Sequence, residues 1–292
     1  MRNFKLTLAY DGGAFHGWQR QPGMRTVQEA VEQAARRVIR HQVAVIGAGR
    51  TDAGVHAAGQ VANFYSDTRM TPEALQNAMG SRLPKDVTLL HMAVVPLSFH
   101  ATLSAVCKLY RYRVFNHSGR PVETGAHAQT YHFWHPLSTE ALRAGAALLV
   151  GRHDFTAMAS KGSQRTTNVR TVQRCDVYRV GLEVRFDVQG DGFLYNQVRN
   201  MVGTLLEVGR GRWPPSRIAE ILESRDRSFA GATAPARGLC MQWVRYDLPS
   251  LAPDPPDGAV AAPEHSPSAA GSANTLAAMM PPGTSLEEEP GG

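Results

Sequence analysis

The chain has 292 residues, of which 43% are hydrophobic and 19% are charged, and its formal net charge at pH 7 is +6. This length is sufficient for one large domain or for two modest domains with cores of their own. No apolar run approaches the roughly 18 residues that span a bilayer, and the N-terminus alternates in polarity instead of forming a secretory signal. We therefore expect a cytoplasmic protein that does not bind a membrane.

The predicted first part of the chain alternates strands and helices. The spacing of apolar residues predicts strands at 4–10, 43–46, 61–65 and 87–95, and helices at 27–40 and 71–80. Thr26 and Glu29 form a capping-box pattern before the first helix. We expect residues 1–105 to form one unit.

Aromatic and basic residues mix in the loop at 15–21, where Trp18 and Arg20 lie. Such a mixture can stack on bases and hold phosphates. It can equally be a loop whose aromatic side chains fill the core, and the residues themselves do not separate the two interpretations.

A glycine-rich stretch at 47–64 connects two short apolar strands and contains one carboxylate, Asp52. Arg50 precedes it by two positions, and His56 follows it by four. An acid and an arginine beside glycine-rich backbone at the end of a strand are typical of a catalytic site. The alternative is an Asp that caps a turn through its own side chain.

The following part of the chain, residues 106–248, is again mixed. We predict strands at 108–115, 182–188 and 239–246, and helices at 139–150, 193–208 and 218–222. Lys108, Tyr110 and Tyr112 share one face of the first of these strands, which could be an edge strand protected by basic residues. Arg199 lies inside the second helix beside its apolar stripe, which is unusual for an arginine unless it is paired.

Charge is unevenly distributed along the sequence. Residues 250–292 contain six acidic residues and no Lys or Arg, so that residues 1–249 carry +12. A part this basic suits RNA as a partner, although basic surface also serves solubility alone. The polar loop at 160–171 contains Lys161 and Arg165, which could touch phosphates. The acidic, Pro-, Ala- and Ser-rich segment at 249–292 is predicted to be disordered.

Three cysteines are far apart and form no CxxC pair: Cys107, Cys175 and Cys240. Their number and spacing argue against a disulfide framework or a zinc site. We expect each to be a small buried side chain. The sequence also contains no nucleotide-binding or metal-protease motif.

Three motifs together resemble the TruA family of bacterial tRNA pseudouridine synthases. The string Gly-Arg-Thr-Asp-Ala-Gly-Val-His-Ala at 49–57 is similar to the motif around the family's catalytic aspartate. The segment at 108–112 resembles the strand that supplies its active-site tyrosine, and residues 192–203 resemble its third motif. The similarity extends over residues 4–247, and residues 10–28 resemble the family's N-terminal signature. Residues 195–197 depart from its usual pattern, so the resemblance gives these three no role.

The resemblance implies an α+β fold, the pseudouridine synthase fold. Two related lobes, residues 1–105 and 106–248, would share a largely antiparallel sheet with helices outside and a basic central cleft. The first lobe would supply Asp52, and the second would supply Tyr110 and Arg199. We expect Arg199 to lower the pKa of Asp52, and Tyr110 to stack on the uracil.

The resemblance also implies the reaction, in which uridines 38, 39 and 40 of the tRNA anticodon stem-loop become pseudouridine. Asp52, Tyr110 and Arg199 would be catalytic, and Arg50 would fill the stack left by the flipped base. The further expected RNA contacts are His56, Trp18, Arg20, Lys161 and Arg165. The reaction would need neither a metal nor a nucleotide cofactor, and the protein would be a homodimer. Two alternatives are a non-catalytic RNA-binding protein and an Asp-dependent hydrolase. Against the hydrolase, the sequence offers no second carboxylate in a comparable motif, which paired-acid glycoside hydrolysis needs.

Overall fold

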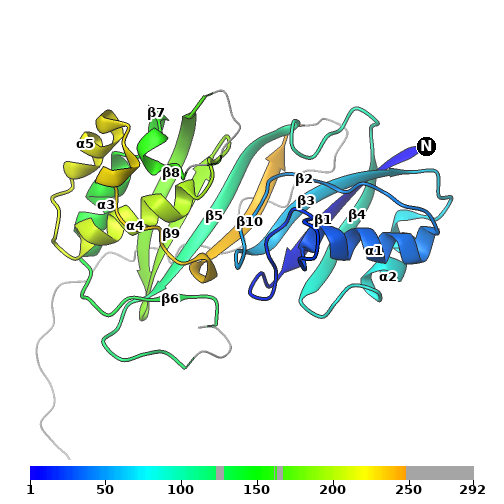
Figure 1. Cartoon of the computed structure of the whole chain (residues 1–292), viewed down its shortest axis with the longest axis horizontal. Coiled ribbons are helices and arrows are strands. Elements are labelled where there is room, and N and C mark those ends of the chain that lie inside the picture. Colours follow the sequence, from blue (N-terminus) through cyan, green and yellow to red (C-terminus); the bar gives the residue numbers. More distant parts are fainter. Residues whose placement is uncertain (123–127, 161, 163–166, 248–292) are drawn as a thin grey trace, which may run out of the picture. The chain divides into compact units, whose positions relative to one another are not determined.

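The computed structural model describes residues 1–122, 128–160, 162 and 167–247. This part is an α+β fold built on one large, mostly antiparallel sheet (Figure 1). Its strands are β1 (Arg2–Tyr10), β2 (Ile46–Gly47), β3 (His56–Ser66), β4 (Val87–Val95), β5 (Ala105–Phe115), β6 (Tyr131–His132), β7 (Gly151–Asp154), β8 (Val169–Val180), β9 (Glu183–Gly190) and β10 (Leu239–Tyr246). The expected fold class is confirmed.

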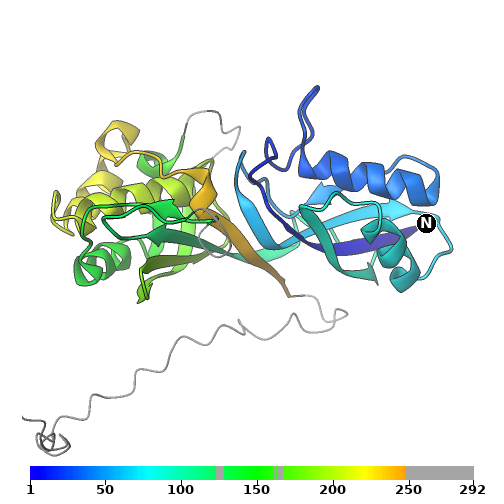
Figure 2. The same ribbon diagram turned by 90° about the horizontal axis from the view of Figure 1, so that it is seen from below.

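The order of the strands places the last strand of the described chain between an N-terminal strand and a C-terminal strand. The sheet runs β4-β1-β3-β10-β5-β9-β8-β7, with β2 paired to β3 and β6 paired to β5. β10 pairs in parallel with β3 and antiparallel with β5. The last strand thus joins the N-terminal strands to the C-terminal strands, and Figure 2 shows β5 and β10 running between the two groups of helices.

Five α-helices are present in the described chain: α1 (Val27–Ile39), α2 (Pro72–Gly80), α3 (Thr139–Ala147), α4 (Gln197–Gly209) and α5 (Arg217–Ser224). The single-turn 3₁₀ segments are η2 (Thr156–Met158), η3 (Arg227–Phe229) and η4 (Ala236–Gly238). In Figure 1, α1 and α2 lie with the N-terminal strands, whereas α3, α4 and α5 lie with β7, β8 and β9. Each of the five helices buries apolar side chains in the hydrophobic core, as amphipathic helices do.

Helix α4 is almost entirely buried, and it begins later than the sequence predicts. Phe193 was expected to start the helix, but the first helical residue is Gln197. Asn196 has a left-handed backbone conformation with a φ of 59°, which a regular helix does not allow. The chain therefore turns sharply at this residue, and the turn lies beside the candidate site.

Other local predictions need correction. The capping box at the start of α1 is not formed, because Thr26 makes no side-chain cap and its buried Oγ1 has no hydrogen-bond partner. Helix α3 ends at Ala147, and Gly151 starts β7 instead of capping the helix. The sequence predicted neither β7 nor β8. Cys240 is only half-buried, although Cys107 and Cys175 are buried as expected.

Strand β5 is central and is not the edge strand considered as an alternative. It pairs along most of its length with β9 and along much of it with β10. The predicted acidic segment at 249–292, and Lys161 and Arg165, lie outside the described residues.

Candidate functional site

The loop between β2 and β3 carries Asp52 and is fixed by hydrogen bonds to its backbone. Ala48 N donates to Val61 O at 2.7 Å, and Gln60 Nε2 donates to Gly49 O at 2.9 Å. Lys108 Nζ, from β5, donates to Ala48 O at 2.7 Å. The loop is thus attached both to its own following strand and to the central strand of the sheet.

A second loop, at residues 11–18, packs directly on the Asp52 loop. Trp18 N donates to Thr51 O at 3.0 Å, and Gly54 N donates to Phe15 O at 3.2 Å. Gly17 has a φ of +87°, and a Cβ there would lie 2.6 Å from Thr51 O. Only glycine permits this combination of backbone angle and close approach. The second loop therefore supports the Asp52 loop and fixes its position.

Tyr110 and Arg199 reach the same place from regular elements. Tyr110 projects from β5 and packs edge-on against Phe193, with 5.3 Å between ring centroids. Arg199 lies in the first turns of α4, and its Nη1 lies 3.4 Å from Asp52 Oδ2. Its Nε donates to Ala234 O at 2.8 Å. A segment that precedes β10 thus helps to hold the guanidinium in place.

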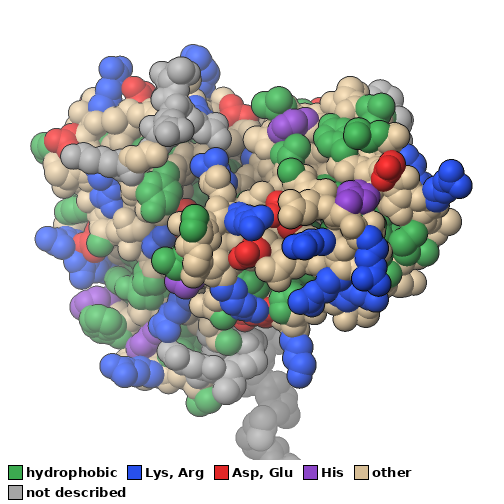
Figure 3. All heavy atoms as spheres, turned by 45° about the vertical axis from the view of Figure 1, so that its right-hand side comes forward, with side chains coloured by type: hydrophobic (Ala, Val, Ile, Leu, Met, Phe, Trp, Pro, Cys, Tyr) green, Lys and Arg blue, Asp and Glu red, His purple; other side chains and the backbone are tan. Residues whose placement is uncertain are grey.

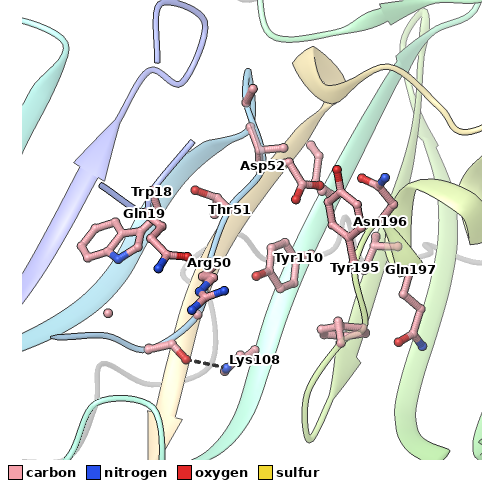
Figure 4. Close-up of a pocket in the computed structure, with 18 of the residues that line it drawn as sticks. Trp18, Gln19, Arg50, Thr51, Asp52, Lys108, Tyr110, Tyr195, Asn196 and Gln197 are labelled. Carbon is pink, nitrogen blue, oxygen red and sulfur yellow. Dashed lines mark hydrogen bonds between the residues drawn. The ribbon is translucent and has the colours of Figure 1, made fainter. Parts of the chain in front are cut away.

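A cavity of about 1000 Å³ brings these side chains together. This volume is at the upper end of the range for small-molecule sites. Asp52, Tyr110 and Arg199 line it, together with the cations Arg50 and Lys108. Figure 4 shows Asp52, Arg50 and Tyr110 around one space, with Asn196 on its opposite side. Figure 3 shows that Lys and Arg side chains also gather on one face of the described part.

The pKa of Asp52 departs from the sequence-based expectation. Burial raises this pKa above its ordinary value, and the opposing effect of the Arg199 guanidinium is the smaller one. The Asp52 side chain is 23% exposed, and the shortest contact to Arg199 is a long 3.4 Å, so that desolvation of the carboxylate prevails. The expected lowering by arginine is real in direction but is outweighed. Burial also raises the pKa of Tyr110 well above its usual range, so its hydroxyl is protonated at neutral pH.

The other residues expected to touch RNA are found in different environments. Arg50 is exposed and lines the cavity. Trp18 also lines it, but only 3% of Trp18 is exposed, and its indole packs against Gly47. Arg20 lies outside the cavity lining, with its side chain 63% exposed and paired with Glu32 at 3.4 Å.

His56 is not placed to bind RNA directly. Its side chain is buried, and Nδ1 accepts a hydrogen bond from Gly12 N at 3.1 Å. Burial lowers the pKa of His56, and this effect outweighs that of Asp11, whose Oδ1 also lies 3.1 Å from Nδ1 and raises the pKa. The two loops approach closely here, since a Cβ on Gly12 would lie 2.0 Å from Val55 O. The hydrogen bond from Gly12 N to His56 therefore helps to hold these loops in contact. The expected RNA contact at His56 does not fit this placement.

Sequence reasoning gave no role to three residues that shape the cavity. Lys108 was noted only as sharing a strand face with Tyr110, yet it binds the loop that carries Asp52. Phe193 supports the Tyr110 ring, and Asn196 accepts a hydrogen bond from Arg199 Nη1 at 2.7 Å. Lys108 could have been found in the sequence from its two-residue spacing from Tyr110, because residues at this spacing on a strand lie on the same face. The late start of α4 concealed the other two.

Among the residues that the structure describes, no group of three or more His, Cys, Asp or Glu side chains could hold a metal ion. No helix among the described residues is long and apolar enough to cross a membrane.

Comparison with known proteins gives a consistent result. A sequence profile described as tRNA pseudouridine synthase matches residues 7–102 and 146–247, and it therefore covers the Asp52 loop and α4. The fold and the site thus define a pseudouridine synthase, a class of isomerases.

Individual relatives identify the family more closely. The chain is 44% identical over 246 residues to tRNA pseudouridine synthase A of Acetivibrio thermocellus, covering 84% of this chain and 100% of the relative. It is 43% identical to the protein of that name from Limosilactobacillus reuteri, covering 84% of this chain and 97% of the relative. The chain belongs to the tRNA pseudouridine synthase A family.

Proposed function

We propose that this protein isomerises uridine to pseudouridine at positions 38, 39 and 40 of the tRNA anticodon stem-loop. One observation carries the proposal: three segments far apart in the sequence place a carboxylate, a guanidinium and a tyrosine on one cavity of about 1000 Å³. Asp52 lies 3.4 Å from Arg199 and remains partly open to that cavity. The family's reaction needs this combination.

The reaction exchanges one bond for another. The bond from the ribose C1′ to N1 of uracil breaks, the base turns, and a bond from C1′ to C5 forms. The proton on C5 is lost, and N1 gains one, so that no electron acceptor is consumed. Asp52 either attacks the sugar or removes a proton from it, and both routes require its ionised form.

The surrounding residues have separate roles in this proposal. Arg199 favours the ionised form of Asp52 and fixes the direction of its carboxylate. Tyr110 contacts the flipped uracil, and its protonated hydroxyl is able to donate a hydrogen bond or pass a proton. Because a paired base must leave its helix to reach the cavity, Arg50 occupies the vacated stack in this proposal, which its exposure at the cavity supports.

The proposal extends to the arrangement of the chain and its partner. Residues 1–105 and 106–248 form two lobes that supply Asp52 and its two partners, respectively. A homodimer binds one tRNA across both subunits in the cytoplasm. The mass of the protein in solution, with and without tRNA, tests the dimer independently of activity.

A tritium-release assay tests the reaction. Unmodified tRNA carrying uridine labelled at C5, with a single uridine at position 38, 39 or 40, is incubated with the protein in the absence of added metal or nucleotide. We expect release from each tRNA by the wild type and none by Asp52→Asn. Tight binding without release would indicate an RNA-binding protein, and free uracil as product would indicate a hydrolase.

A further inference from the structure

Asn196 has an unusual position at the edge of the cavity. It immediately precedes α4, and its φ of 59° and ψ of 7° place it in the left-handed region. Asparagine tolerates this region better than most residues other than glycine. A residue at this position usually caps the helix, but the Asn196 side chain makes no such cap. Its amide is directed elsewhere.

The amide of Asn196 connects two elements of the site. Its Oδ1 accepts a hydrogen bond from Arg199 Nη1 at 2.7 Å, and its Nδ2 donates to Ser160 Oγ at 3.0 Å. Ser160 N in turn donates to Tyr195 O at 3.0 Å. The two ends of the Asn196 amide are thus both engaged, which fixes the orientation of its oxygen toward the guanidinium.

The contacts of Arg199 show why this oxygen matters. Nη1 lies 2.7 Å from Asn196 Oδ1 but 3.4 Å from Asp52 Oδ2, and Nε is bonded to Ala234 O at 2.8 Å. The two short hydrogen bonds are therefore to groups other than the carboxylate. They fix the plane of the guanidinium, and the approach to Asp52 follows from that plane.

We propose that Asn196 is a positioning residue that holds the Arg199 guanidinium against the Asp52 carboxylate. This inference rests on the proposed function, since it concerns the same three residues. It assigns two separate tasks to one residue. The backbone supplies the left-handed turn that starts α4 at Gln197, and the side chain orients the guanidinium of Arg199.

Loss of the Asn196 amide should change the pKa of Asp52. A less well placed Arg199 opposes the effect of burial on Asp52 less strongly, so the pKa of Asp52 rises further. The charged and titratable groups on the cavity are His16, Arg50, Asp52, Lys108, Tyr110, Tyr195 and Arg199. Of these, Arg199 is the group that Asn196 contacts. The acidic limb of the pH-activity profile is therefore the readout that a purely structural role would leave unchanged.

Two substitutions separate the backbone from the side chain. Asn196→Gly keeps easy access to the left-handed conformation but removes the amide, whereas Asn196→Ala removes the amide and also strains the turn. We expect both variants to lose about tenfold in kcat. In both, the acidic limb should move to higher pH, while KM for tRNA changes less than about twofold.

The same substitution in an Arg199→Lys background tests the route. If Asn196 acts through the guanidinium, Asn196→Gly should add little further loss there, so the two effects are not additive. An Asn196→Gly variant with wild-type kcat and pH profile would overturn the inference, and so would fully additive losses.

The wild type and Asp52→Asn are assayed in parallel. A wild type without tritium release would defeat the proposed function itself, whereas an active wild type with an unaffected Asn196→Gly would defeat only the role of Asn196. Melting temperatures show whether Asn196→Ala remains folded.

Discussion

The two sides of the cavity are built in different ways. Asp52 lies on an irregular loop whose position depends on backbone contacts with residues 11–18 and on Lys108. Tyr110 and Arg199 lie on a central strand and a buried helix, whose own hydrogen bonds fix their backbones. The backbone that carries the acid is thus held by neighbouring segments, whereas the backbones that carry its two partners are held by secondary structure.

This difference predicts which kinds of substitution should lower the activity on each side. Substitution of Tyr110 or Arg199 should alter mainly the chemistry that the side chain performs, because the backbone beneath it is independent of that side chain. The Asp52 side should also lose activity when a substitution such as Gly17→Ala displaces the backbone that carries the carboxylate. Substitutions on both sides can sharpen or break this comparison.

The largest effect is expected from Asp52→Asn. Loss of the carboxylate should lower the rate by about a thousandfold or more, measured as pseudouridine content of digested tRNA. Since burial raises the pKa of Asp52, ionisation costs stability above that pKa, and the cost disappears as pH falls through it. The variant should therefore melt at pH 7 no lower than the wild type. Activity above a tenth of the wild-type rate would contradict the assignment.

Arg199→Lys should follow, with a loss of about a hundredfold in kcat. Lysine keeps the charge but cannot hold Asn196, Ala234 and Asp52 with one planar group. The pKa of Asp52 should rise, so the acidic limb of the pH profile moves upward. A profile that superimposes on that of the wild type would show that the two residues are not coupled.

Gly17→Ala tests the support from the second loop. Its Cβ would lie 2.6 Å from Thr51 O at a φ of +87°, so we expect a loss of about 2 kcal/mol in the free energy of unfolding. Activity should fall about tenfold because Asp52 moves. Gly23→Ala is the matched control, since Gly23 has a φ of +72° with open space around it. Equal effects of the two on activity would remove the support role.

Lys108→Gln should have a smaller effect. It shortens the side chain that donates to Ala48 O at 2.7 Å, and loosening of the Asp52 loop should cost about fivefold in kcat. Lys85→Gln, at an exposed position, controls for the change in charge. A variant of Lys108 that changes only KM would indicate an RNA contact instead of a support for the loop.

The least local effect is that of salt, which acts on tRNA binding and not on the chemical step. If many phosphates contact the basic part of the chain, tRNA affinity should fall steeply as ionic strength rises. Binding isotherms between about 50 and 200 mM salt measure the slope. A flat response would contradict the basic binding surface.

The sequence predicted the two sides of the site unequally. Alternating apolar residues identified β1, β5 and β9, and a gapless motif identified Asp52, because both signals are local. The turn at Asn196 was missed, since the apolar stripe of α4 continues backward through Leu194 and conceals the start of the helix. The lowering of the Asp52 pKa by Arg199 was expected, but the larger opposing effect of burial was not, because a sequence shows a neighbouring charge more readily than the amount of burial. The role of His56 depends on a loop 44 residues away, which no local pattern reveals.

Photocrosslinking tests most directly whether the target uridine enters this cavity. A tRNA with 4-thiouridine at position 39 is bound to Asp52→Asn protein, irradiated, and digested for peptide mass spectrometry. We predict crosslinks to residues that line the cavity, with Tyr110 and Phe193 foremost. Crosslinks confined to residues outside the cavity lining, from a tRNA bound with wild-type affinity, would contradict the account.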